Sequence, residues 1–237
     1  MDDKPENLLS HIIALRKVLV NSCFAIFIAM ILAFIFIDQI TEFVAAPLLK
    51  ALAAYNKSSN LIYTSITELF SLQLKLSFYT SLAVCFPYIL YQFWTFIKPG
   101  LKQKEIDISK KFILLATGFF FAGMIFAFYI VIPNIFKVFL TNVTNVDFLP
   151  RISENISFII VLMISFGISF QLPILIYILD KLKILRISTL RKLWREIILA
   201  IVVLSALITP PDAMSMAFLA APLIILYFLS LVFCSFL

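Results

Sequence analysis

The chain alternates long apolar runs with short segments that carry most of its charges. A helix needs about 20 mostly apolar residues to cross the hydrocarbon core of a bilayer. The pattern therefore predicts six membrane-spanning helices, and the first four runs are long enough to cross on their own. The expected spans lie near residues 18–37, 69–97, 112–136, 156–179, 193–208 and 214–236.

The last two runs allow two interpretations. The fifth has only about a dozen apolar residues unless Leu193–Glu196 extend it, so one tilted helix through both runs is the competing interpretation. The runs are separated by Thr209–Asp212, which reads TPPD. Two adjacent prolines remove backbone donors and clash with the preceding turn, which favours two helices.

A fifth span this short has a consequence for assembly. The bilayer must thin locally, or the helix must lie beside a wet groove. The last two spans are therefore expected to form a docking surface for partner helices, with Leu204, Met214 and Leu219 as positions that face a partner.

Composition restricts the class of protein. Of the 237 residues, 63% are hydrophobic and 14% are charged, whereas a soluble domain carries about 25% charged residues. Too little polar surface is left to cover a water-soluble globule, so the expected fold is a single all-α membrane domain over residues 1–237. Prolines inside or at the ends of the spans kink helices, and kinked, tilted helices suit a concave wall. These are Pro87, Pro133, Pro173 and Pro222.

The positions of Lys and Arg predict the orientation. The N-terminal segment holds three of them, the segment after the second span five and the segment after the fourth six, against four on the opposite side. Because cytoplasmic loops are enriched in these residues, both termini are expected in the cytoplasm. The net charge of +6 thus reports topology and an attraction to anionic membrane lipid rather than to nucleic acid.

Few residues support catalysis. The three cysteines lie in separate apolar runs without C-x-x-C spacing, and one histidine, His11, excludes a multi-histidine metal site. With only four glycines the chain has no phosphate-binding loop. We expect no enzyme activity, no cofactor and no metal. A small-molecule transporter, the rival class, would need ionisable residues at the midplane of several spans or an inverted repeat; the main intramembrane polar groups are Gln73, Lys75 and Gln171.

Five sequence blocks occur in an order that resembles one family. They read SHIIALRKVL, PYILYQFWTFIKPGLKQKE, FGISFQLP, TPPD and PLIILYFLS, and they begin at residues 10, 87, 166, 209 and 222. Together they are similar to the TatC family, the multi-spanning core subunit of the twin-arginine, or Sec-independent, protein translocase. The blocks cover nearly the whole chain.

The resemblance implies the function. TatC proteins bind the twin-arginine signal peptides of folded precursor proteins. They recruit TatA-like and TatB-like single-span partners into a hetero-oligomer with several copies, and transport is driven by the proton-motive force. The expected location is the bacterial cytoplasmic (inner) membrane, with an organellar inner membrane as the alternative.

The resemblance also implies a binding site. The glutamate after the P-G-L turn contacts the arginine pair in the family and corresponds here to Glu105. A carboxylate accepts a bidentate guanidinium bond, which is partly shielded from water at a membrane surface. The alternative is a local salt bridge between Glu105 and a neighbouring lysine. The other positions expected in this site are Arg16, Lys17, Phe96 and Pro99.

Three acidic positions of the family are neutral in this chain. Ala14 stands where H-L-x-E-L-R has a glutamate that also contacts the arginine pair, Gln171 replaces the acid of F-G-x-x-F-E-x-P, and Phe228 replaces an acid in the last span. The change at Ala14 leaves open a second function, that of a divergent TatC-like scaffold with reduced signal-peptide binding.

The remaining family positions are assigned structural or partner contacts. Pro47 is expected to open the outer loop after the first span. Pro210, Pro211 and Asp212 form the tight outer turn between the last spans, where Asp212 caps the sixth helix. Glu68 and Lys75, seven residues apart, share one face of the second span, where Lys75 either snorkels or contacts a partner.

Overall fold

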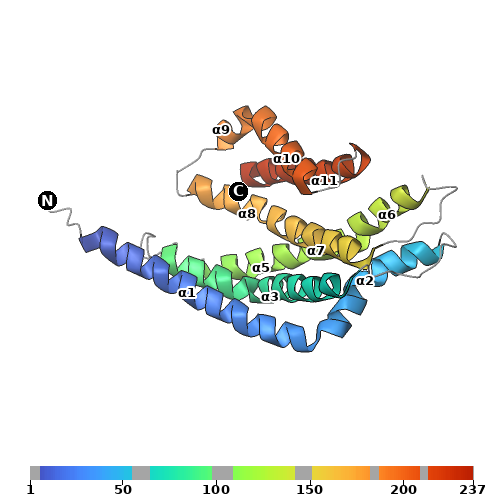
Figure 1. The fold of residues 1–237 in the computed structure, drawn as a ribbon. Coiled ribbons are helices and arrows are strands. Elements are labelled where there is room, and N and C mark those ends of the chain that lie inside the picture. Colours follow the sequence, from blue (N-terminus) through green and yellow to red (C-terminus); the bar gives the residue numbers. More distant parts are fainter. Residues whose placement is uncertain are drawn as a thin grey trace. The chain divides into compact units, whose positions relative to one another are not determined.

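The computed structural model describes residues 6–54, 65–97, 109–141, 151–181, 187–208 and 213–236, and in them the chain is almost wholly helical (Figure 1). This agrees with the expected all-α class. The elements are α1 (Glu6–Ile35), α2 (Ile37–Ala54), α3 (Ile66–Ile97), α5 (Ser109–Phe126), the π-helical η2 (Ala127–Val131), α6 (Ile132–Thr141), α7 (Ile152–Ser169), α8 (Leu172–Lys181), α9 (Ile187–Lys192), α10 (Trp194–Ile208) and α11 (Ala213–Phe236).

Four stretches of these helices are long and apolar enough to cross a membrane. They are Ile12–Ile35, Thr67–Phe96, Ile113–Thr141 and Ile152–Ile178, and they match the first four expected spans. Helix α10, which corresponds to the fifth expected span, has 15 residues. Its length is about 22 Å, whereas the hydrocarbon core is about 30 Å thick. Separate helices α10 and α11 agree with the two-helix interpretation. A total of six spans and the cytoplasmic placement of both termini stay predictions.

The sequence suggested that Pro47 opens a loop, but the structure places it within a helix. It is buried inside α2, which follows α1 after a single turn residue, Phe36. The backbone N–H of Ile40 bonds to the carbonyl of Phe36 at 3.1 Å, so the first turn of α2 starts from this turn residue. The prediction failed because a proline was taken as a helix end, although a buried helix tolerates one when neighbours satisfy the freed carbonyl.

The third span contains a wide turn just before a proline. The π-helical segment Ala127–Val131 joins α5 to α6, and Pro133 follows it directly in the first turn of α6. A proline ring clashes with the carbonyl four residues earlier, here that of Tyr129. A π turn re-aims this carbonyl and explains how the helix continues through Pro133.

The fourth expected span consists of two helices, α7 and α8, with a break close to Pro173, one of the prolines expected to kink a span. The N–H of Gln171 bonds to the carbonyl of Ile168 at 2.9 Å, three residues back, and α8 begins at Leu172. Pro173 has no N–H to continue the α-helical pattern toward Ser169, so the chain tightens into a turn there. Gln171 therefore lies at a helix break.

The chain divides into two compact units. The first contains residues 1–40 and 73–118, and the second contains 41–72 and 119–237. In the first, α1 and the main part of α3 run antiparallel (Figure 1), and the Cys85 thiol lies 3.5 Å from the carbonyl of Ala25. Small side chains allow this close approach. The buried ones are Ser22, Ala33, Ser77, Ser81, Ala83 and Cys85.

Two glycines allow α5 and α7 to pack closely at the centre of the second unit. A Cβ on Gly123 of α5 would lie 2.6 Å from the carbonyl oxygen of Phe166, and one on Gly167 of α7 would lie 2.7 Å from the ring of Phe120. The backbone of each helix at its glycine thus lies close to the other helix, with no room for a side chain between them. Helix α11 packs on α8, α9 and α10 in the same unit (Figure 1), and the hydroxyl of its buried Tyr227 donates to the Leu190 carbonyl in α9 at 2.8 Å.

Candidate functional site

The first part of the expected signal-peptide site lies at the start of α1. Ala14, Arg16 and Lys17 are all exposed there. The methyl group of Ala14 offers no acceptor to an arginine. Among residues 12–17, the exposed charged side chains are therefore two cations.

The second part lies at the end of α3. Phe96 is half-buried in the last turn, next to exposed Tyr91 and Thr95. The Thr95 hydroxyl donates to the carbonyl of Tyr91 at 2.9 Å, so its polar group is satisfied within the helix. The α3 end therefore presents aromatic surface. Pro99 and Glu105 lie outside the residues that the structure describes.

The contact between Cys85 and Ala25 places these two parts at the same end of the first unit. Ala14 lies eleven residues before Ala25, and Phe96 lies eleven residues after Cys85. Because α1 and α3 are antiparallel (Figure 1), both positions lie about 16 Å from the contact in the same direction. An aromatic helix end and two exposed cations thus flank the point where the chain leaves α3 toward Glu105.

The two other neutral replacements belong to the second unit. Gln171 is half-buried at the break between α7 and α8, and Phe228 is 41% exposed on α11. The amide of Gln171 keeps hydrogen-bonding capacity at a lower burial cost than a charge would have. Pro210, Pro211 and Asp212 lie outside the described residues, so the expected cap of the sixth span stays a prediction.

Glu68 lies in a polar contact that the sequence did not indicate. The Ser153 hydroxyl of α7 donates to the Glu68 carboxylate. The Ser65 hydroxyl accepts the N–H of Glu68 at 3.2 Å, an N-terminal cap for α3. Lys75, further along α3, is exposed. Ser153 was missed because 85 residues separate it from Glu68 and no local motif marks it.

The described residues contain no group of three or more His, Cys, Asp or Glu side chains that could hold a metal ion. The described part of the expected site, at the start of α1 and the end of α3, presents exposed cations and aromatic side chains. Such groups recognise peptides, lipids or partner helices.

The helices and their apolar lengths define a multi-pass α-helical membrane protein. The family model for the Sec-independent protein translocase protein TatC matches residues 10–222. The chain belongs to the TatC family.

Relatives and solved structures agree over nearly the full length. The chain is 36% identical to the Sec-independent protein translocase protein TatC of Magnetococcus marinus over 95% of this chain and 83% of that one. It is 33% identical to the Escherichia coli protein of the same name, over 97% and 88%. A crystal structure described as the twin arginine translocase receptor TatC superposes with a TM-score of 0.86, at 32% identity, over 95% of this chain and 98% of that one.

Proposed function

We propose that the chain is the translocase subunit that binds twin-arginine signal peptides of folded precursor proteins. The observation that carries this is the match in fold and sequence, over 95% of the chain, to a protein described as the twin arginine translocase receptor. A transporter of small molecules has no comparable support.

Glu105 is the proposed arginine contact. It follows Lys98, Lys102 and Lys104 in the segment after α3, where Glu105 and Asp107 are the carboxylates that a cationic ligand could contact. A guanidinium forms two parallel bonds with a carboxylate, and such charge-assisted bonds are about twice as strong as neutral ones. Phe96 and Pro99 would position this segment relative to the end of α3.

Arg16 and Lys17 have a different role in the proposal. Two exposed cations repel an arginine pair, so they do not contribute affinity through direct contact with it. Their position at the start of the first span suits binding of anionic lipid phosphates, which would fix the depth of α1 at the membrane surface. That depth sets how far a peptide at the α3 end reaches into the bilayer.

Partner subunits are proposed to dock on α10. Its exposed apolar residues Leu199, Val203 and Leu207 recur every four residues and form one face, next to exposed Leu204. Leu219 of α11 is fully buried, so the expectation that it faces a partner is wrong. Because α10 is shorter than the bilayer core, a TatA-like or TatB-like single-span helix lying on this face would meet a thinned membrane.

The proposed setting is the bacterial inner membrane. Energy would come from the proton-motive force, with no catalytic step in this subunit. The Rickettsia prowazekii protein that is 35% identical over 95% of this chain has the same translocase name, which supports a bacterial setting over an organellar one.

The test is capture of a precursor. A folded reporter with a twin-arginine signal peptide is incubated with membrane vesicles that contain the chain, and crosslinked complexes are quantified. The matched control replaces the two signal arginines with lysines, which keeps the charge but removes the bidentate geometry. Capture of the arginine form alone is the expected result.

The alanine at position 14, where the family has a glutamate, supports a second candidate function, that of a divergent TatC-like scaffold with reduced signal-peptide binding. A scaffold would assemble with single-span partners but capture both reporters equally weakly. Equal capture of the arginine and lysine forms, together with intact partner crosslinks from Leu204, would replace the receptor proposal with the scaffold.

A further inference from the structure

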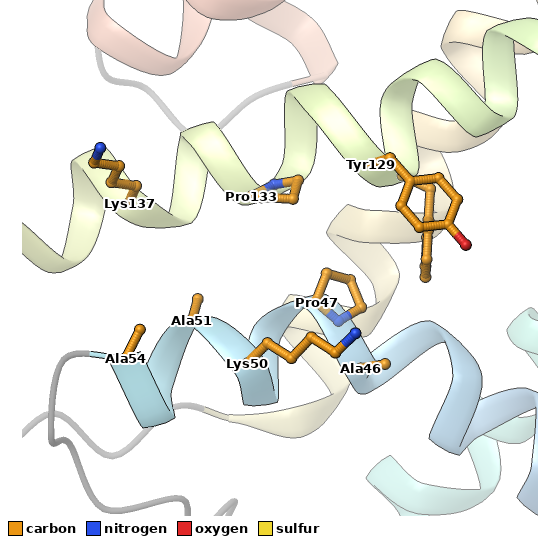
Figure 2. A pocket seen from close by; sticks show the side chains of 9 residues that line it. Ala46, Pro47, Lys50, Ala51, Ala54, Tyr129, Pro133 and Lys137 are labelled. Atoms are coloured by element: carbon orange, nitrogen blue, oxygen red, sulfur yellow. The ribbon is translucent and has the colours of Figure 1, made fainter.

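A groove in the second unit lies between α2 and the end of the third span. Residues of α2 at spacings of three and four line one wall, namely Pro47, Lys50, Ala51 and Ala54, and residues four apart line the other, namely Tyr129, Pro133 and Lys137 (Figure 2). Ala46 and Phe128 complete the lining, and the volume is about 590 Å³. This size falls in the range of small-molecule sites.

The two walls of the groove are also in contact through a pair of aromatic rings. The rings of Phe43 on α2 and Phe128 on η2 stack with centroids 4.8 Å apart and planes 5° apart. Pro47 is buried in the α2 wall. Because the π turn Ala127–Val131 contributes both Phe128 and Tyr129, the same local structure anchors α2 and lines the groove.

The charge in the groove has one sign. Lys50 and Lys137 are both exposed, and neither takes part in the ion pair between described residues, Arg151–Glu154. Among the residues that the structure describes, no carboxylate lines the groove. Figure 2 shows Lys50 lying along α2 toward Pro47 and Lys137 at the opposite end of the groove.

The rest of the described lining is mostly apolar, with three alanines, two prolines, one phenylalanine and one tyrosine. A free inorganic anion would gain nothing from this floor and would leave it wet. A ligand with an anionic head and a hydrocarbon chain satisfies both parts, since the chain covers the floor and the head meets an ammonium group.

The position along the chain agrees with such a ligand. The third apolar stretch ends at Thr141, one helical turn after Lys137, so Lys137 lies where this span leaves the hydrocarbon. Helix α2 follows the first apolar stretch, which ends at Ile35. In the predicted topology the first and third spans leave the membrane on the same side, which would put both walls of the groove at one bilayer surface.

We propose that this groove binds one anionic phospholipid, with its phosphodiester at Lys50 or Lys137 and one acyl chain along the floor formed by Pro47, Ala51 and Pro133. The site shares no residue with the arginine-recognition segment after α3, and the proposal does not depend on signal-peptide binding. The bound phospholipid would hold α2 against α6 at the membrane surface.

The test uses the full chain purified in a neutral maltoside detergent. Native mass spectrometry counts retained lipid after titration with phosphatidylglycerol, with phosphatidylcholine or with phosphatidylglycerol plus excess inorganic phosphate. The wild type should retain one phosphatidylglycerol in preference to phosphatidylcholine, and phosphate should not displace it. Lys50→Gln and Lys137→Gln should each weaken retention about fivefold, and the double variant more.

Two further variants control for charge and for folding. Lys192→Gln removes an exposed lysine of α9 outside the groove and should leave retention unchanged. Ala51→Leu fills the floor without altering charge and should lower retention of both lipids. Lipid with a photoreactive acyl chain should crosslink to peptides that contain Ala46–Ala54 or Tyr129–Lys137.

Several results would overturn the proposal. Equal retention of the two lipids, insensitivity to both lysine variants, or displacement by inorganic phosphate would each exclude an anionic phospholipid site. Disulfide crosslinking between two copies through Ala51→Cys, in a chain without its native cysteines, would identify a second copy as the occupant instead.

Discussion

The hydroxyl of Ser153 donates a hydrogen bond to the carboxylate of Glu68 and joins the first turn of α7 to the first turn of α3. Glu68 is half-buried, and a bond to a carboxylate there is worth more than one between neutral groups. The finding gives Glu68 a structural role between two helices that 85 residues of sequence separate.

The first prediction concerns this bond. Ser153→Ala should lower the free energy of unfolding by about 1–3 kcal/mol, because the carboxylate loses a charge-assisted partner in a partly buried place. Glu68→Gln should cost less, since an amide oxygen still accepts the bond. Thermal unfolding in detergent provides the measurement.

The adjacent pair Arg151–Glu154 serves as the control. Nη1 of Arg151 lies 2.9 Å from Oε1 of Glu154, but the side chain of Arg151 is 56% exposed and that of Glu154 is 68% exposed. An exposed ion pair contributes about 0–1 kcal/mol, so Glu154→Ala should change stability little. If Ser153→Ala and Glu154→Ala have the same small effect, the Glu68 contact is not a structural bond.

The second prediction concerns close helix packing. Gly123→Ala should destabilise the protein by about 1–3 kcal/mol, as overpacking does. The new Cβ would lie 2.6 Å from a backbone oxygen of Phe166 and 2.8 Å from the ring of Phe170, and a backbone atom cannot move away cheaply. The measurement is again thermal unfolding.

Gly118 is the matched control on the same helix. A Cβ there meets nothing within 4 Å, and alanine is a better helix former than glycine. Gly118→Ala should therefore be neutral or stabilising. Equal destabilisation at Gly118 and Gly123 would mean that glycine is needed for something other than contact with α7.

Much of the helix pattern was predictable from the sequence, and the exceptions have physical causes. The apolar runs gave the first four spans because lipid exposure demands continuous hydrophobicity. The break at Gln171 lay next to a visible proline, but its place depends on which N–H still finds a carbonyl. Pro47 was misassigned because burial inside α2 depends on contacts that no local pattern shows.

The candidate site was predictable only in part. A resemblance of motifs indicates which residues bind a peptide, and the structure adds that the start of α1 and the end of α3 share one end of the first unit. Lys50 and Lys137 are 87 positions apart in the sequence. In the sequence they contributed only to the prediction of membrane orientation, whereas the structure shows that both line one groove. Contacts between distant residues are set by packing, which periodicity does not encode.

The third prediction concerns α9. Tyr227→Phe removes the hydrogen bond to the Leu190 carbonyl, whose net value is about 1 kcal/mol. Local opening of α9 should become about fivefold more populated, and trypsin should cleave faster after exposed Arg191 and Lys192. Cleavage is followed by mass spectrometry.

Ser230→Ala is the control for that experiment. The Ser230 hydroxyl bonds to the Leu226 carbonyl within α11 itself, at 2.6 Å. Its removal should leave the cleavage rate in α9 unchanged. A similar acceleration by both variants would show that α11 as a whole had loosened and that Tyr227 does not anchor α9 specifically.

The fourth prediction is the orientation. Reporter fusions at Lys102 and Lys183 should report the cytoplasm, and those at Asn56, Asn145 and Asp212 the outer side. The reason is the excess of Lys and Arg in the segments after the second and fourth spans. An outer-side signal at Lys102 would reverse the orientation, and equal signals at Lys183 and Asp212 would mean that α10 does not cross the membrane.

The fifth prediction concerns Glu105. With Ala14 in place of a second carboxylate, Glu105 should carry most of the arginine recognition. A charge-assisted bond is worth about 1.5–3 kcal/mol, or about ten- to a hundredfold in affinity. Glu105→Gln should therefore sharply weaken crosslinking of a twin-arginine precursor in membrane vesicles without changing thermal unfolding.

Two further variants separate recognition by Glu105 from a local salt bridge with its lysine neighbours. Glu105→Asp keeps the charge and loses only reach, so it should weaken crosslinking less than Glu105→Gln does. Ala14→Glu adds an acceptor at the exposed start of α1, at the same end of the first unit as Phe96, and should strengthen capture. If the wild type and Glu105→Gln crosslink equally and Ala14→Glu changes nothing, then Glu105 is a surface ion-pair residue and the chain acts as a scaffold.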